Sequence, residues 1–271
     1  MDTRPIGVFD SGLGGLTAVR TLWDLLPQEE LVYFGDTARV PYGTRSRETI
    51  LQYARQDVRF LRTFQPKALV VACGTISTTS LAELSAETPV PVVGVVEPAC
   101  QEAAERTHSG RIGVIATPAS IRSGAYGAAL RRLTPGVEVT ERACPLFVPL
   151  VENGRFQRGD VVIETVAREY LAPLREAGID TLILGCTHYP LLREVIAEIM
   201  EGSVALISAG EAAVRELKRL LEARGLLRES DFPGETRFYV SDRTEGFEAS
   251  ASAFLQEDLR HTARRIDIEQ Y

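Results

Sequence analysis

Lysine is scarce in this chain of 271 residues, where it occurs only at Lys67 and Lys218. Lys67 follows Pro66 at the foot of an expected strand, and Lys218 falls on the charged side of an expected helix. Neither position suits the desolvated amine that forms a Schiff base with pyridoxal phosphate. We therefore expect no pyridoxal phosphate cofactor.

Long apolar runs are also missing. The run Ile6–Phe9 near the N-terminus is too short for a secretory signal. No segment approaches the roughly 20 apolar residues that cross a bilayer. The formal net charge of -7 argues against nucleic acid or an anionic membrane as the main partner. We expect a cytoplasmic protein that acts on a small molecule.

The four cysteines are far apart and form no Cys-x-x-Cys pair: they are Cys73, Cys100, Cys144 and Cys186. This spacing argues against a zinc site or a redox dithiol, so we expect no metal. Disulfides are not expected in a reducing compartment. Cys100 and Cys144 have no polar company in the sequence, and we predict that both are packing residues.

Short apolar runs alternate with longer amphipathic stretches, which is typical of a parallel sheet covered by helices. The expected strands are Ile6–Asp10, Leu31–Asp36, Ala68–Cys73, Val92–Val96, Arg111–Thr117, Val137–Cys144, Thr181–Cys186, Val204–Ser208 and Arg237–Asp242. The expected helices are Leu16–Leu26, Ser46–Phe64, Pro98–Thr107, Ser120–Leu133, Gln157–Ala177, Leu191–Met200, Glu211–Arg224 and Thr244–Leu259.

The second half of the chain resembles the first. Ala68–Cys73 and Thr181–Cys186 are both apolar strands that end in a small residue and then cysteine, and Gly7–Ser11 parallels Gly113–Thr117. We predict an α/β fold of two similar doubly wound parallel-sheet domains, related by a pseudo-twofold axis, with the active site in the cleft between them. The expected domains are residues 1–97 plus 209–271, and residues 98–208.

Cys73 and Cys186 both fall at the carboxyl ends of expected strands, where open α/β sheets bind their ligands. Two thiols that face each other across a cleft suit racemisation, in which one group removes the Cα proton and another delivers a proton to the opposite face. A thiolate is a competent base, and its neighbours can tune its pKa.

Each cysteine is followed by groups that can bind a carboxylate: Gly74 and Thr75 in the first half, Thr187 and His188 in the second. His188 can also exchange protons with a nearby thiol or amine. Alternatively, the two threonines are helix N-caps. Glu152, in an expected loop, is a carboxylate that can assist Cys186 through His188.

The segment Asp10–Gly15 is rich in glycine but lacks the third glycine of a dinucleotide-binding motif, because position 17 is threonine. We favour a tight turn that presents Asp10 and Ser11, with Asp10 binding an ammonium group or steering a thiol. The turn Pro41–Gly43 can offer backbone N–H groups to an anion, although the spacing alone favours a plain loop.

Four segments together resemble the signatures of the glutamate racemases: residues 7–17, 35–43, 70–73 and 185–190. The resemblance implies that Cys73 acts on D-glutamate and Cys186 on L-glutamate, with Asp10, Glu152 and His188 assisting. It implies substrate binding by Asp10, Ser11, Pro41, Tyr42, Gly43, Gly74, Thr75, Thr187 and His188. It also implies that the enzyme needs no cofactor, supplies D-glutamate for peptidoglycan synthesis and forms a homodimer.

One residue departs from that family pattern. Members usually carry asparagine where this chain has Gly74, so the side-chain amide is lost while the backbone N–H remains. We expect Gly74→Asn to be tolerated and to change the KM more than the kcat.

Three alternatives stay open. A racemase for aspartate or another acidic amino acid has the same build, but His188–Pro190 speaks against it because aspartate racemases typically carry an acidic residue at position 188. A non-catalytic amino-acid-binding protein would not need paired cysteines at matching strand ends. A nucleotide-binding protein is disfavoured by the incomplete glycine motif.

Overall fold

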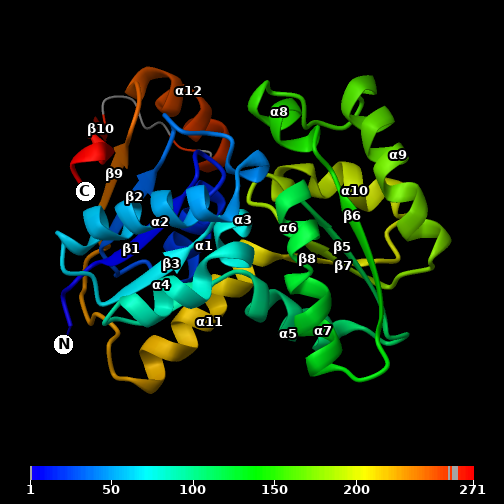
Figure 1. Cartoon of the computed structure of the whole chain (residues 1–271), viewed down its shortest axis with the longest axis horizontal. Helices are drawn as coiled ribbons and strands as arrows, with labels where there is room; N and C mark the ends of the chain where they lie inside the picture. Colours follow the sequence, from blue (N-terminus) through cyan, green and yellow to red (C-terminus); the bar gives the residue numbers. More distant parts are fainter. Residues whose placement is uncertain (1, 256, 258–261) are drawn as a thin grey trace.

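Two parallel sheets form the framework of this computed structural model, which describes residues 2–255, 257 and 262–271 (Figure 1). The first sheet contains β1 (Ile6–Asp10), β2 (Leu31–Gly35), β3 (Ala68–Val71), β4 (Val92–Gly94), β9 (Thr236–Val240) and β10 (Ala263–Arg265). The second contains β5 (Arg111–Ala116), β6 (Glu138–Ala143), β7 (Thr181–Leu184) and β8 (Ala205–Ser208). All pairs of strands in the described residues are parallel.

The order of the strands confirms the internal repeat. The first sheet runs β10-β9-β2-β1-β3-β4 and the second β6-β5-β7-β8, so the series β2-β1-β3-β4 recurs in the second half. The strand β9, which corresponds to the last strand expected from the sequence, returns to the first sheet beside β2, as expected. The predicted α/β fold of two similar parallel-sheet units is therefore confirmed, while the residue limits proposed for the domains stay a prediction.

Helices follow the strands along the chain and cover the two sheets (Figure 1). In the first half these are α1 (Leu16–Leu25), η1 (Tyr42–Thr44), α2 (Arg47–Arg62), α3 (Gly74–Thr79) and α4 (Leu81–Glu87). Next come α5 (Val96–Arg106), α6 (Pro118–Ser123), α7 (Ala125–Leu133), α8 (Phe147–Glu152), α9 (Val161–Glu176), η2 (Tyr189–Leu192) and α10 (Arg193–Ile199). The chain ends with α11 (Ala209–Ala223), α12 (Thr244–Leu255) and η3 (Ile268–Gln270).

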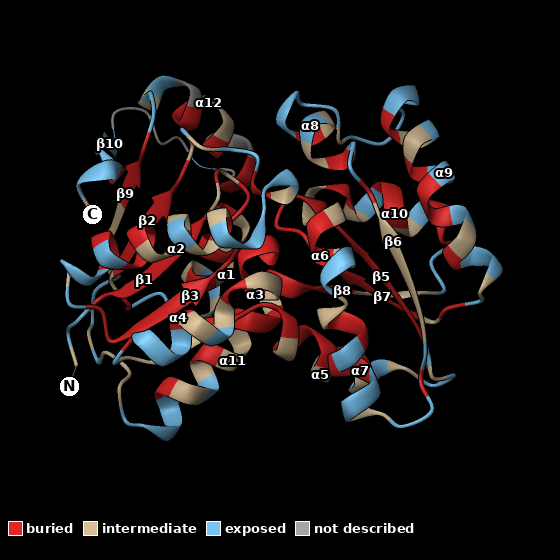
Figure 2. Cartoon of the chain, in the orientation of Figure 1, coloured by how far each residue is buried: buried red, intermediate tan, exposed pale blue. Residues whose placement is uncertain are grey.

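The central strands are buried along their whole length (Figure 2). Apolar side chains on both faces of β1, β2, β3 and β7 pack under helices, which is why these strands read as continuous hydrophobic runs in the sequence. The edge strand β6 is only partly buried. Among the described residues, no helix is long and apolar enough to cross a membrane.

The helix expected at Ser120–Leu133 is two helices, α6 and α7. The chain turns between them at Gly124, whose φ of 66° lies in the left-handed region that favours glycine. The first of the two begins earlier than expected because Thr117 accepts a hydrogen bond from the Ser120 N–H group and Pro118 occupies the first turn.

Other boundaries also differ from the expectations. Glu152 is the last residue of α8 and not part of a loop. Val96, expected in a strand, begins α5. The helices α3 and α4 and the strand β10 were not expected at all. The expected continuation of α12 to Leu259 lies outside the described residues.

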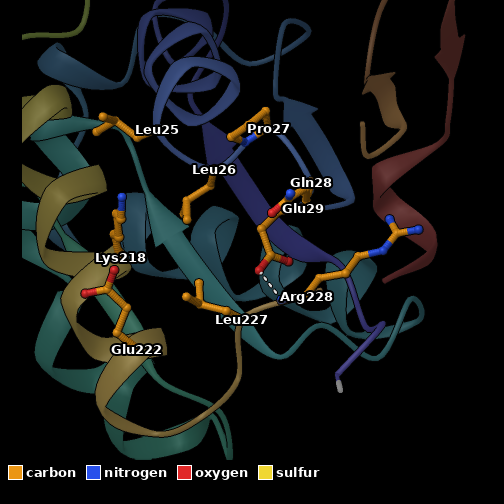
Figure 3. A pocket seen from close by; sticks show the side chains of 9 residues that line it. All are labelled: Leu25, Leu26, Pro27, Gln28, Glu29, Lys218, Glu222, Leu227 and Arg228. Carbon is orange, nitrogen blue, oxygen red and sulfur yellow. Dashed lines mark hydrogen bonds between the residues drawn. The ribbon is translucent and has the colours of Figure 1, made fainter. Parts of the chain in front are cut away.

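A buried ion pair closes the edge of the first sheet where its strands begin. Lys67 Nζ lies 2.5 Å from Glu29 Oε2, and both side chains are almost completely buried. The other oxygen of Glu29 accepts a hydrogen bond from the N–H group of Arg228. Beside this pair is a small cavity of about 180 Å³, which Lys218 and Glu222 of α11 line together with Glu29 (Figure 3).

We predict that Lys67→Met lowers the free energy of unfolding by about 3–5 kcal/mol, because it leaves the buried carboxylate of Glu29 without a counter-charge. Urea unfolding measures this loss. The matched control is Lys218→Met at the chain's other lysine, which is half-buried and should change stability by no more than about 0.5 kcal/mol. Equal effects of the two substitutions would contradict the prediction.

Candidate active site

A cavity of about 310 Å³ lies at the carboxyl ends of both sheets. It brings together eleven residues that the sequence singled out: Ser11, Pro41, Tyr42, Gly43, Cys73, Gly74, Thr75, Glu152, Cys186, Thr187 and His188. Residues that the sequence reading missed complete the wall: Gly12, Val40, Thr44, Thr117, Pro118, Cys144, Pro145, Val148, Pro149 and Gly185. The two cysteines expected to carry the chemistry therefore share one cavity.

Cys73 follows β3 and is buried. Its Sγ lies 3.4 Å from the hydroxyl oxygen of Ser11, to which the thiol can donate. Burial, followed by the nearby carboxylate of Asp10, raises the pKa of the Cys73 thiol to about 12. This cysteine is therefore a thiol at neutral pH in the absence of substrate.

Asp10 supports this side of the site from below and does not line the cavity. Its Oδ2 accepts hydrogen bonds from the N–H groups of Gly12 and Gly15, while Oδ1 has no hydrogen-bond partner among the described residues. Burial raises the pKa of Asp10, and the charge of His188 opposes that rise. A carboxylate thus occupies the glycine-rich turn that a nucleotide phosphate would need, which argues against the nucleotide-binding alternative.

Cys186 follows β7 and is paired with a histidine. Its Sγ lies 3.9 Å from His188 Nδ1, and His188 Nε2 lies 3.0 Å from Glu152 Oε1. Burial lowers the pKa of His188, but the hydrogen bonds to Cys186 and Glu152 outweigh it and raise the pKa to about 10. The imidazole is therefore a cation at neutral pH, and it lies between the Cys186 sulfur and the Glu152 carboxylate.

A row of hydroxyl groups, each within hydrogen-bond distance of the next, joins the two halves at the cavity. Thr75 Oγ1 of α3 lies 3.1 Å from Thr117 Oγ1, which in turn lies 3.1 Å from Ser120 Oγ in α6. Thr75 and Thr117 both line the cavity, so their hydroxyls are available to a polar ligand. Thr75 is not a helix N-cap, since Cys73 holds that position in α3, and Thr187 caps none of the described helices.

Two glycines of the first half face the Gly185–His188 segment of the second half at very short range. A Cβ atom at Gly14 would lie 2.0 Å from Thr187 Oγ1. A Cβ atom at Gly74 would lie 2.4 Å from the carbonyl oxygen of Gly185. This contact counts against the expectation that Gly74→Asn is tolerated, because backbone would have to move to admit the side chain, and the expectation itself stays a prediction.

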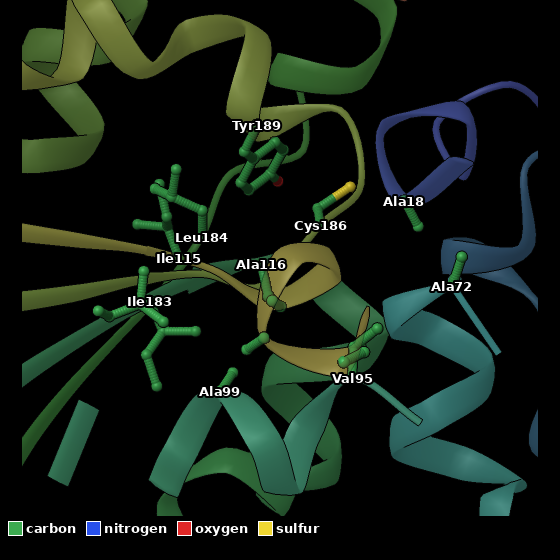
Figure 4. Packing of buried hydrophobic residues seen from close by; sticks show 14 of the residues in the cluster. Ala18, Ala72, Val95, Ala99, Ile115, Ala116, Ile183, Leu184, Cys186 and Tyr189 are labelled. Carbon is green, nitrogen blue, oxygen red and sulfur yellow. The ribbon is translucent and has the colours of Figure 1, made fainter. Parts of the chain in front are cut away.

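Beneath these contacts the two halves share one apolar cluster (Figure 4). Small side chains from the first half, Ala18 and Ala72, belong to the same cluster as Cys186 and Tyr189 of the second. Cys144 also belongs to it, and although it was predicted to be a packing residue only, it contributes to the cavity wall. Among the described residues there is no group of His, Cys, Asp and Glu side chains that could hold a metal ion.

Two similar α/β halves each bring a thiol to one cavity, and a carboxylate lies near each thiol. These are the features of an amino-acid racemase. The chain belongs to the Asp/Glu/Hydantoin racemase family, whose model matches residues 17–217.

Known members of the family resemble the chain over nearly its whole length. A glutamate racemase of Geobacter metallireducens is 48% identical over 255 residues, which cover 94% of each protein. Among solved structures, a glutamate racemase from Francisella tularensis in complex with D-glutamate has a TM-score of 0.92 at 40% identity, with all of both chains covered. A glutamate racemase from Thermus thermophilus in complex with beta-chloro-D-alanine has a TM-score of 0.89 at 42% identity, also over both whole chains.

We predict that Gly74→Ala lowers kcat/KM by about 100-fold, because the methyl group forces the loops that carry the two thiols apart. The matched control is Gly210→Ala, where a Cβ would meet only Ala18 and Thr17 at 3.8 Å. Steady-state kinetics measures the loss, and thermal unfolding shows whether each variant is folded. An unchanged kcat/KM in Gly74→Ala would contradict the prediction, because it would show that the two thiol-bearing loops can separate without loss of activity.

We also predict that the His188 imidazole titrates near pH 10 and that Glu152→Gln lowers this midpoint, because the substitution removes a carboxylate that favours the cation. Since the folded pKa exceeds the unfolded value of about 6.5, the stabilisation is complete below pH 6.5 and is lost as pH rises through 10. Imidazole NMR suits this test, since the chain has only three histidines. Glu198→Gln on the surface is the control, and an unchanged midpoint in Glu152→Gln would refute the pairing.

Proposed function

We propose that this protein interconverts L- and D-glutamate by a two-base mechanism that needs no cofactor. The observation that carries the proposal is that Cys73 and Cys186 come from equivalent strand ends of the two halves and line one cavity. The glutamate racemases that match the whole chain, one of them in complex with D-glutamate, support glutamate as the substrate.

In the direction from L-glutamate, the Cys186 thiolate removes the Cα proton and becomes a thiol. The Cys73 thiol gives its proton to the opposite face of the carbanion and becomes a thiolate, so one proton leaves the substrate and another enters it. His188 and Glu152 assist Cys186, and Asp10 assists Cys73. The reverse direction exchanges the roles of the two thiols.

The cavity wall described here contains no lysine or arginine. The substrate carboxylates would therefore bind to hydroxyls and backbone N–H groups, from Ser11, Thr75, Thr117 and Thr187 and from the turn Pro41–Gly43. The substrate ammonium would approach the carboxylate of Glu152. These assignments extend the substrate-binding set expected from the sequence by Thr117, while Asp10 acts from behind the wall.

Further parts of the proposal come from the family resemblance. The D-glutamate would serve peptidoglycan synthesis, and the enzyme would be a cytoplasmic homodimer. Residues 1–97 plus 209–271 would form one domain and residues 98–208 the other. An aspartate racemase is the second candidate, and His188 beside Cys186 favours glutamate over it.

We expect the chelated and dialysed enzyme to racemise L-glutamate and to leave L-aspartate nearly unchanged, as followed by circular dichroism. In heavy water, D-glutamate formed early should carry deuterium while the remaining L-glutamate carries little, because the two faces use different thiols. Cys73→Ser and Cys186→Ser should each lower racemisation by more than about 100-fold, whereas Cys100→Ser serves as the control thiol. Early unlabelled D-glutamate, or strong racemisation by Cys73→Ser, would reject the mechanism.

A further inference from the structure

A second cluster of charged groups lies beneath the turn that lines the cavity at Tyr42, and the mechanism above does not use it. Asp36 follows β2, Asp57 lies in α2, and both side chains are fully buried. Arg39 lies between them with only 10% of its side chain exposed. Two buried acids around one guanidinium are costly to desolvate, so their presence calls for a physical reason.

Arg39 contacts both acids at once. Its Nε lies 2.6 Å from Asp36 Oδ2, and a terminal nitrogen lies 3.2 Å from Asp57 Oδ1. The other terminal nitrogen donates to Gln56 Oε1 at 2.5 Å, and the guanidinium carbon lies 4.1 Å from the centre of the Tyr53 ring. The planar guanidinium donates to both carboxylates and stacks on the Tyr53 ring at the same time, which the single ammonium group of lysine cannot do.

The same Asp36 oxygen that binds Arg39 also accepts a hydrogen bond from the hydroxyl of Tyr42. Ser241 donates to the second oxygen of Asp36 at 2.7 Å and accepts a hydrogen bond from the Ala38 N–H group. Tyr42 is 1% exposed and lines the cavity together with Pro41 and Gly43. Asp36 therefore links Arg39 to the Pro41–Gly43 turn through its hydrogen bond with Tyr42.

We propose that Arg39, held between Asp36 and Asp57, is a positioning residue that fixes the Pro41–Gly43 turn for substrate binding. The inference rests on the proposed function, since it gives that turn the task of holding a glutamate carboxylate. Arg39 itself does not line the cavity, so its effect passes through Asp36 and Tyr42. Its further contact at 3.3 Å with Glu269 ties the C-terminal segment η3 to the same group.

The test replaces Arg39 by lysine, which keeps the charge but cannot contact both acids in the same fork. We expect the KM for glutamate to rise about tenfold or more while kcat falls less than about threefold, because the turn binds ground and transition states alike. Arg55→Lys is the matched control, since Arg55 lies in α2 close to Asp57 in sequence but forms a surface pair with Glu87. It should leave both constants unchanged.

Hydrogen exchange of residues 36–45 gives a readout that does not depend on catalysis. We expect faster exchange there in Arg39→Lys than in the wild type or in Arg55→Lys, with similar thermal unfolding. If Arg39→Lys does not fold, Asp57→Asn tests the same positioning role. This variant keeps an oxygen that can accept a hydrogen bond from Arg39, and it should also raise the KM for glutamate. If the wild type does not racemise glutamate but residues 36–45 exchange faster in Arg39→Lys, the proposed function is rejected and the positioning role stays in place. Unchanged exchange, or a fall in kcat at constant KM, would overturn the positioning role.

Discussion

The short segment Gly185–His188 touches the first half of the chain at two places where a side chain would not fit. Gly14 faces Thr187, and Gly74 faces the carbonyl oxygen of Gly185. Because each pair joins opposite halves, a side chain at either glycine would hold the two cysteine-bearing loops further apart. The shared cavity and the contact between the Thr75 and Thr117 hydroxyls both depend on this close approach.

Much of the framework could be predicted because buried parallel strands are apolar on both faces and end at polar or small residues. The repeat of an apolar strand followed by cysteine located β3 and β7 and placed both thiols at the same edge. Two of the missed elements, α3 and β10, lack such a pattern. α3 contains Ser77 and neighbouring threonines in place of an apolar period, and β10 includes two arginines, so only their packing in the fold reveals them.

The site was predicted in part from spacing and in part from resemblance. Thr117 was not predicted as a site residue, although the repeat aligns it with Ser11. Both residues carry a hydroxyl group at the end of a strand. Asp10 lies close enough to Cys73 for its charge to raise the pKa of that thiol, but its position behind the cavity wall depends on how the glycine turn folds back over it. The contact between Glu152 and His188 spans 36 residues and arises from α8, which the sequence did not indicate.

The two halves share a backbone plan but give their thiols opposite electrostatic surroundings. Burial and Asp10 raise the pKa of the Cys73 thiol, whereas the Cys186 sulfur lies 3.9 Å from the Nδ1 atom of His188. In the proposed mechanism, two equivalent strand ends thus supply one acid, Cys73, and one base, Cys186, for the direction from L-glutamate. One turnover of that mechanism would leave Cys73 as the thiolate beside Asp10. Because burial and Asp10 disfavour a thiolate at Cys73, the proposed cycle requires Cys73 to regain a proton and Cys186 to lose one before the next turnover from L-glutamate.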